Sequence, residues 1–334
     1  MDLTRFSTVS RLAVAGILAL GLAADARAVR RTEDSLALVP ASAGTVGVIR
    51  WNELRSSPLG PKIFASMDEI STDGDAARFL AETGLTPRED IDTVIVAMSP
   101  GGHPGPGDDD GLVIFEGRFD TNKIGDALKS RGASLMKSPS GDAYYRLAGK
   151  GSDTEGAVSL VNRGLIVAGS ERAVLAALAR KESGGSGGLT SGEGLGKYLS
   201  RVDTSASAWA LVDMARFTHG ANVEGGGEGE PSRAVVGAMK SVTLLALQAK
   251  VRDDAVDLEA TGLTPDAEKR DLLEDSLRGV LAMWRMAVSE KSPELVSVIR
   301  KFQVEHDADS VSIRGSLPGS FLRSLASQRQ AVKN

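Results

Sequence analysis

Short runs of aliphatic and β-branched residues, each followed by turn-forming residues, set the strongest limit on how this chain can fold. The runs at 45–51, 91–98 and 111–119 are "TVGVIRW", "IDTVIVAM" and "GLVIFEGRF". Such composition is typical of β-strands. Helical stretches alternate with these runs, among them "ERAVLAALARK" at 171–181. The pattern predicts an α+β fold of two similar halves, each a mainly antiparallel sheet with helices packed on one face.

The chain has no cysteine, and aromatic residues make up only 4% of it. Disulfides and thiolate chemistry are therefore excluded. The core must be built from Leu, Val, Ile and Ala, because buried apolar surface is the remaining source of stability. The 334 residues suffice for two units of about 150 residues, each able to bury roughly 70% of its unfolded surface.

The longest helical pattern, at 265–288, predicts a single apolar stripe that faces the core. Its members follow the spacing of one helix face, namely Leu273, Leu277, Val280, Leu281 and Trp284. Trp209 lies within an apolar strand, so we expect Trp209 and Trp284 to be buried. Trp51 ends its strand beside Arg50, and it is the tryptophan that best suits contact with a partner.

The N-terminal 28 residues have the pattern of a secretory signal peptide. Arg5 and Arg11 precede an apolar run at 12–23, and Ala26-Arg27-Ala28 fits a cleavage site with small residues. The apolar run is short for a bilayer core of roughly 30 Å. We therefore expect a periplasmic or secreted mature chain that begins at Val29, without stable membrane insertion.

The charge of the mature chain limits its partners. Residues 1–28 hold three basic and two acidic residues, which leaves 36 basic against 42 acidic residues in the mature chain. A mildly acidic chain without a basic block is poorly suited to nucleic acid or anionic membranes. The expected partner is an envelope protein or a small apolar ligand, and no cofactor is expected.

The order of elements recurs in the two halves and predicts an internal repeat. "VIRWNELR" at 48–55 matches "WALVDMAR" at 209–216, and "DTVIVAM" at 92–98 matches "SVTLLAL" at 241–247. The segment at 182–204 is rich in Gly and Ser and ends in a short helix, which is typical of a linker. The predicted division is a signal peptide at 1–28, a first α+β repeat at 29–181, this linker, and a second repeat at 205–334.

Several stretches resemble a class of exported bacterial α+β proteins that have no assigned activity. They are "LVPASAGTVGVI", "GLTPREDIDTVIVA", "FEGRFD", "LIVAGSERAVLAAL" and "SASAWALVDM". These stretches are hydrophobic patterns with helix caps, and they cover most of the mature chain. The resemblance implies an envelope location and a duplicated fold, and it brings no catalytic residues with it.

Two polar loops could hold a metal ion or a general base. In "GGHPGPGDDDG", His103 with Asp108 and Asp110 offers imidazole and oxygen ligands for a divalent cation. Its position between two β-runs favours the solvated loop of a hairpin. In "VEHDADS", His306 and Asp309 could form a histidine–carboxylate base, although turn chemistry explains the same residues.

Three further patterns have a structural explanation. Asn52 and Asp213 lie at matched strand ends and suit helix N-caps. "GGSGG" around Ser186 has the letters of a nucleophile elbow, but no buried strand precedes it. "GEGLGKY" lacks the Ser or Thr that follows the lysine of a phosphate loop. We expect the two glycine-rich stretches to belong to the linker.

These observations favour a non-catalytic exported protein with a binding or scaffolding role. The first alternative is a metal-assisted hydrolase of unfamiliar type, which would use His306 with nearby acids or His103 with its aspartates. The second alternative is a carrier that holds an apolar ligand between helices and sheet. We assign no catalytic residue, no cofactor and no metal ligand beyond these candidates.

Overall fold

A computed structural model describes residues 32–61, 74–99, 111–147, 156–217, 241–289 and 293–322. The strands are β1 (Thr45–Arg50), β2 (Ile91–Met98), β3 (Gly111–Gly117), β4 (Ser134–Lys137), β5 (Ala143–Leu147), β6 (Gly156–Asn162), β7 (Leu165–Ser170), β8 (Ala208–Asp213), β9 (Leu244–Arg252), β10 (Ala255–Leu263), β11 (Gln303–His306) and β12 (Ser310–Pro318). The helices are α3 (Trp51–Ser56), α5 (Gly74–Thr83), α6 (Pro87–Asp90), α7 (Thr121–Ser130), α8 (Glu171–Glu182), α9 (Met214–Phe217), α11 (Ala267–Ser289) and α12 (Pro293–Ile299), with 3₁₀ turns η2 (Leu189–Ser191) and η3 (Gly194–Arg201).

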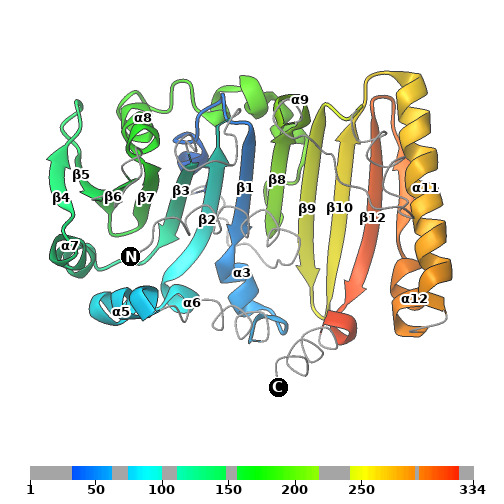
Figure 1. Cartoon of the computed structure of the whole chain (residues 1–334), viewed down its shortest axis with the longest axis horizontal. Coiled ribbons are helices and arrows are strands. Elements are labelled where there is room, and N and C mark those ends of the chain that lie inside the picture. Colours follow the sequence, from blue (N-terminus) through cyan, green and yellow to red (C-terminus); the bar gives the residue numbers. More distant parts are fainter. Residues whose placement is uncertain are drawn as a thin grey trace.

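All these strands form one sheet in the order β11-β12-β10-β9-β8-β1-β2-β3-β7-β6-β5-β4 (Figure 1). Every strand pair in it is antiparallel. The predicted α+β class with a mainly antiparallel sheet is confirmed. β2 and β3 pair directly, as the hairpin prediction requires, while the loop between them lies outside the described residues.

The sheet has the same strand order on both sides of its central pair, β1 and β8. One side reads β1-β2-β3-β7-β6 and the other reads β8-β9-β10-β12-β11. The sequence match of 48–55 with 209–216 places Val48 on Trp209, and these two residues are direct partners in the β1–β8 ladder. A two-fold axis through this pair would exchange the halves. The duplication and its domain boundaries stay a prediction.

Val48 and Trp209 point to one face of the sheet, here called face A. Along one row of paired residues, this face changes from apolar to polar. Val167, Ile114, Ile95, Val48 and Trp209 follow one another across five strands and are all buried. The row continues through Gln248, Glu259 and Arg314 on β9, β10 and β12. Along this row, face A is therefore apolar from β7 to β8 and polar from β9 to β12.

The apolar part of face A is covered by residues 32–43, α8, η2 and η3. Leu36, Val39, Leu178 and Leu189 join the strand side chains in one buried cluster. The glycine-rich segment predicted as a linker is folded against residues 37–41, since Leu189 N donates to Val39 O over 2.8 Å. Gly194 has φ of +53°, and an added Cβ would lie 1.9 Å from the carbonyl oxygen of Ala41. Glycine thus permits the turn and the close packing of this segment.

Helices also pack on the opposite face, face B. Val94 and Ile166 belong to a cluster with Ile124 and Leu128 of α7, whereas their chain neighbours Ile95 and Val167 belong to the cluster on face A. Successive residues of a strand point to opposite faces. In the first half, helices therefore lie on both faces rather than on the one face predicted, because its strands are apolar on both sides.

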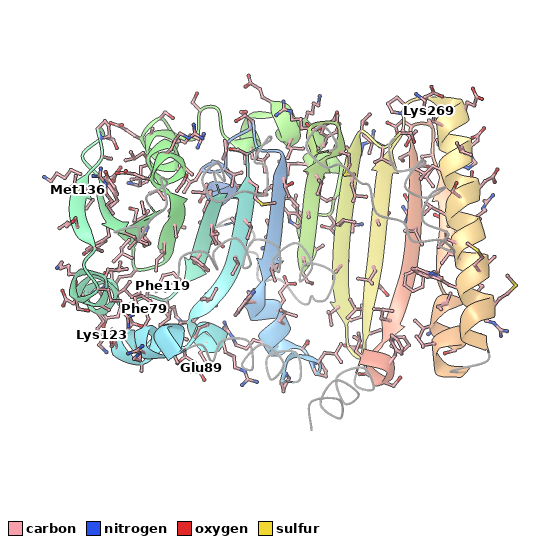
Figure 2. The ribbon with its side chains drawn as sticks, viewed as in Figure 1. Phe79, Glu89, Phe119, Lys123, Met136 and Lys269 are labelled. Atoms are coloured by element: carbon pink, nitrogen blue, oxygen red, sulfur yellow. The ribbon has the colours of Figure 1, made fainter. Side chains whose placement is uncertain are left out.

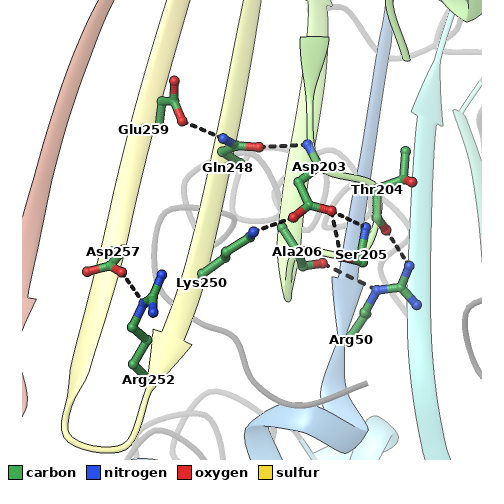
Figure 3. A network of polar contacts seen from close by, with 10 residues as sticks. All are labelled: Arg50, Asp203, Thr204, Ser205, Ala206, Gln248, Lys250, Arg252, Asp257 and Glu259. Carbon is green, nitrogen blue, oxygen red and sulfur yellow. Dashed lines mark hydrogen bonds and ion pairs between the residues drawn. The ribbon is translucent and has the colours of Figure 1, made fainter. Parts of the chain in front are cut away.

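A buried arginine ties β1 to the segment before β8. Arg50 is only 2% exposed. Its Nε donates to Ala206 O over 3.3 Å, its Nη2 to Thr204 O over 2.5 Å, and its Nη1 to Thr32 Oγ1 over 3.1 Å. Burial lowers the pKa of Arg50, while the charges of nearby acids raise it. Figure 3 shows the contacts with Thr204 and Ala206.

Two buried carboxylates accompany this arginine. Glu116 is 2% exposed and Glu53 is 1% exposed. Glu116 accepts hydrogen bonds from Ser35 Oγ over 2.5 Å and from Thr32 Oγ1 over 3.1 Å. The cluster therefore fastens the first described residues of the chain to β1 and β3.

The helix caps differ in part from the predicted ones. Asp213 Oδ1 accepts from Arg216 N over 3.2 Å and caps α9, as predicted. The prediction for Asn52 is wrong, because α3 begins one residue earlier, at Trp51, and its N-cap position is Arg50. At α11, Asp266 Oδ1 accepts from Lys269 N over 3.2 Å, so Asp266 caps this helix.

Candidate functional site

Helix α11 lies at one end of the sheet, beside β11 and β12 (Figure 1). Its Leu273 and Leu277 pack with Val242, Val304 and Val311 in a small apolar cluster. Lys269, at the start of the helix, and Met136, on β4, lie at opposite ends of the molecule in Figure 2. α11 thus covers the edge strand β11, whose free backbone groups would otherwise be open to pairing.

A histidine–glutamate pair joins α11 to β11. His306 Nδ1 lies 2.5 Å from Glu274 Oε2, and Arg278 pairs with the other oxygen of this carboxylate. The Glu274 side chain is 7% exposed, whereas the His306 side chain is 52% exposed. His306 faces this carboxylate with Nδ1, so Nε2 is the ring nitrogen that does not contact Glu274.

Two more side chains of α11 bond to the backbone of the last hairpin. Arg285 Nη2 donates to Phe302 O over 3.0 Å, and Arg270 Nη1 donates to Ala308 O. These contacts lie on the same side of the helix as Glu274. Polar contacts and a small apolar cluster together hold α11 against the sheet.

The structure separates the two candidate residues at the last turn. His306 contacts Glu274, whereas both carboxylate oxygens of Asp309 accept from Arg201, over 3.1 and 2.5 Å. These hydrogen bonds lower the pKa of Asp309 below its usual value. His306 therefore has a carboxylate partner, but this partner is Glu274 and comes from a helix.

The other metal candidates, His103, Asp108 and Asp110, lie outside the described residues. In the ranges that the structure describes, no three His, Asp or Glu side chains gather in a way that could hold a metal ion.

The outer side of α11 presents an apolar stripe, here called the outer stripe, made of Leu272, Gly279, Met283 and Met286. Leu272 is 59% exposed, Met283 39% and Met286 67%. Their spacing of seven, four and three residues places them on one side of an α-helix. An added Cβ at Gly279 would meet no atom within 4 Å. This stripe was not among the predicted features, and its helical spacing beside the inner stripe is the sequence signal for it.

The three tryptophans differ in burial. Trp209 is fully buried, as predicted, whereas Trp284 is 53% exposed, so its core assignment is wrong. The apolar cluster under α11 includes Leu273 and Leu277 but does not reach Trp284. Trp51 is half-buried and packs against the cluster on face B. Its suggested role in partner binding stays a prediction.

The polar part of face A is a ladder of cross-strand pairs (Figure 3). Gln248 Nε2 donates to Glu259 over 2.5 Å, Arg314 Nε donates to Glu259 over 2.7 Å, and Arg252 Nε donates to Asp257 over 2.5 Å. Antiparallel sheets commonly have one solvated face. The ladder is consistent with a solvated face.

Among the acids of this region, Asp203 has the largest resolved change of pKa. Burial raises the pKa of Asp203, but hydrogen bonds from Lys250 and Ser205 outweigh burial and lower the pKa to about 2. In an unfolded chain the pKa of Asp is about 3.9. The folded state is therefore favoured by this ionisation above about pH 4, and the gain is lost as the pH falls towards 2.

We expect Asp203→Asn to lower the free energy of unfolding by up to about 1 kcal/mol at pH 7, because the pair with Lys250 is partly exposed and screened. The difference from the unmodified protein should shrink between about pH 4 and pH 2. Urea unfolding at several pH values measures it. A difference that stays constant over this range would contradict the assignment.

An open depression of about 940 Å³ lies beside the N-terminus of α7. Arg118, Asp120, Asn122 and Arg163 contribute to its lining, together with Phe119.

None of the helices in the described ranges combines the length and the apolar composition that are needed to cross a bilayer.

Comparisons with known proteins give only distant structural likeness. No protein-family model matches the chain, and no curated protein matches it in sequence. The chain is similar to crystal form III of TP0453, with a TM-score of 0.47 and 12% identity over 87% of this chain and 97% of that chain. Form IV gives a TM-score of 0.44 with 11% identity over 87% and 95% of the two chains, and form I gives 0.44 with 10% identity over 88% and 96%. At these values the likeness supports no statement about function.

Proposed function

We propose that this chain is an exported, non-catalytic binding or scaffolding protein whose partner docks on the outer stripe of α11. One observation carries the proposal. Five large apolar side chains are exposed in the described part of the chain, and three of them, Leu272, Met283 and Met286, lie on the outer stripe. Single exposed apolar residues are ordinary, whereas a contiguous exposed patch marks an interaction site.

Gly279 supports the same conclusion. Glycine inside a helix costs about 1 kcal/mol relative to alanine. The space around Gly279 is open, so a side chain there would fit within the described structure. The fold of the chain itself does not require glycine at this place, whereas close approach of a partner would.

The export part of the proposal is supported by the signal-peptide pattern at 1–28, a segment that lies outside the described residues. We expect the protein from the envelope fraction to begin at Val29, which N-terminal sequencing and intact mass will measure. A protein that still carries Met1, or that is found in the cytoplasm, would contradict export and would leave the binding proposal to its own test.

A photo-reactive residue at position 272, in living cells, tests the binding proposal. We expect a specific cross-linked product, because Leu272 lies on the outer stripe. The matched control is the same probe at Leu135, which is 55% exposed on β4. Equal products from both positions, or none from position 272, would show that the outer stripe is not a docking surface.

The pair of His306 and Glu274 favours a second candidate function, a hydrolase in which His306 acts as general base. Carboxylate-oriented imidazoles serve this role when substrate lies beside them. His306→Gln in purified protein should then abolish turnover on esterase, phosphatase and peptidase substrates. If the unmodified protein has no such activity, or if the variant keeps it, the hydrolase function is ruled out.

A further inference from the structure

We infer that the occupant of the outer stripe is a second copy of this chain, docked so that the two α11 helices run antiparallel and cross at Gly279. The inference rests on the proposed function, because both use the same surface. It goes further in naming the partner and in fixing the geometry of the contact.

The stripe is self-complementary about its glycine. Leu272 lies seven residues before Gly279, and Met286 lies seven residues after it. Each is about 10 Å from the glycine along the helix axis. In an antiparallel pair that crosses at Gly279, Leu272 of each copy therefore meets Met286 of the other. A two-fold contact uses the same patch twice, and it requires this kind of symmetry in the sequence.

The residues between these positions suit close helix packing. Leu272, Ser276, Gly279, Met283 and Met286 follow a spacing of four and three residues, which is the pattern of a helix seam. Side chains at the contact set helix axes about 8–10 Å apart. A glycine at the crossing permits the shorter end of this range, and the flexible methionine side chains can then fill the space beside it.

Charge selects the antiparallel arrangement. Glu268, Asp271 and Asp275 are exposed on the first half of the helix, beside the outer stripe. None of the three forms an ion pair with a residue in the described ranges, whereas Lys269 pairs with Asp266 and Arg278 pairs with Glu274. A parallel pair would bring the acids of both copies together. The antiparallel pair places them beside the apolar second half of the other helix, which avoids repulsion between like charges.

The expected dimer is weak. α11 has 23 residues and is about 34 Å long. A strip of this length and about 10 Å width buries on the order of 700 Å² in total, which is less than the roughly 1,200 Å² of a stable interface. We therefore expect a dissociation constant in the range of about 10–100 µM, and a dimer that forms only at high local concentration.

Single cysteines test the geometry, since the chain has none of its own. Under mild oxidation, Gly279→Cys should cross-link with itself, and an equal mixture of Leu272→Cys and Met286→Cys should give the mixed dimer. Leu272→Cys alone should stay monomeric, as should the exposed control Leu135→Cys. Strong self-linking of Leu272→Cys would indicate a parallel pair, and Leu135→Cys linking as fast as Gly279→Cys would indicate random collision. Either result overturns the inference.

A second variant separates the contact from folding. Gly279→Arg adds bulk in open space, and it should raise the melting temperature by roughly 2 °C, because it removes a glycine from the helix. The same variant should weaken the dimer by at least about tenfold in sedimentation equilibrium. Should the dimer persist unchanged, or should the chain sediment as a monomer at all concentrations, the inference fails. If the photo-reactive residue at position 272 then cross-links to a different protein in cells, the proposed function holds although the inference of a homodimer fails.

Discussion

Replacing Arg50 with alanine should lower the free energy of unfolding by about 3–5 kcal/mol, because it removes a buried guanidinium, its hydrogen bonds and its attraction to nearby buried carboxylates. Arg50 is 2% exposed, and Glu53 and Glu116 are among the charges that act on it. The variant also leaves the carbonyl groups of Thr204 and Ala206 without a donor. Urea unfolding of the purified protein, followed by circular dichroism, measures the loss.

The matched control is Arg252→Ala. Arg252 pairs with the carboxylate of Asp257, but its side chain is 71% exposed. An exposed pair of this kind contributes less than about 1 kcal/mol. Equal losses in the two variants would show that the buried cluster does not fasten the N-terminal residues to the sheet.

The second large effect is expected at Trp209. Trp209→Ala should cost about 3–5 kcal/mol, because it removes the largest fully buried side chain from the centre of the sheet and leaves a cavity. Trp209 packs on face A opposite Val48, its partner in the β1–β8 ladder. The loss is measured by chemical unfolding at pH 7.

Trp284→Ala is the control, because this side chain is 53% exposed. We expect a loss below about 0.5 kcal/mol, as for other surface substitutions. A large loss at Trp284 would mean that its side chain stabilises the packing of α11, although the apolar cluster of Leu273 and Leu277 does not reach it.

These two tryptophans show which kind of burial can be predicted from the sequence and which cannot. Trp209 sits in a run whose apolar residues are buried on both faces of a central strand, so local pattern and burial agree. Trp284 continues the helical spacing of Leu273, Leu277 and Leu281, and the pattern alone places it in the core. Burial also needs a surface to pack against, and a local pattern does not show how far that surface extends.

The strands and most hairpins could be predicted because they depend on local features. β-branched runs and turn residues mark β2, β3, β6, β7, β9 and β10, and each hairpin joins neighbours in the chain. The central pairing of β1 with β8 joins strands more than 150 residues apart. The repeated order of elements is consistent with this pairing, but only the folded sheet determines its register.

The candidate site was predicted less well, for a related reason. His306 was a candidate because acids surround it in the sequence, yet its carboxylate partner, Glu274, lies on a helix 32 residues away. That contact exists only once α11 docks on β11. The outer stripe is weaker in the sequence than the inner one, because Ser276 and Gly279 separate Leu272 from Met283.

Methionine oxidation in cells and in dilute solution tests the central claim, that the outer stripe of α11 is a docking surface. Met283 and Met286 are exposed, and Met136 is half-buried against the core. In dilute purified protein, peroxide should oxidise Met283 and Met286 faster than Met136, because oxidation requires access. In intact cells the account predicts that Met283 and Met286 are protected several-fold while Met136 reacts at an unchanged rate. Equal rates for Met283 and Met286 in cells and in dilute solution would contradict it.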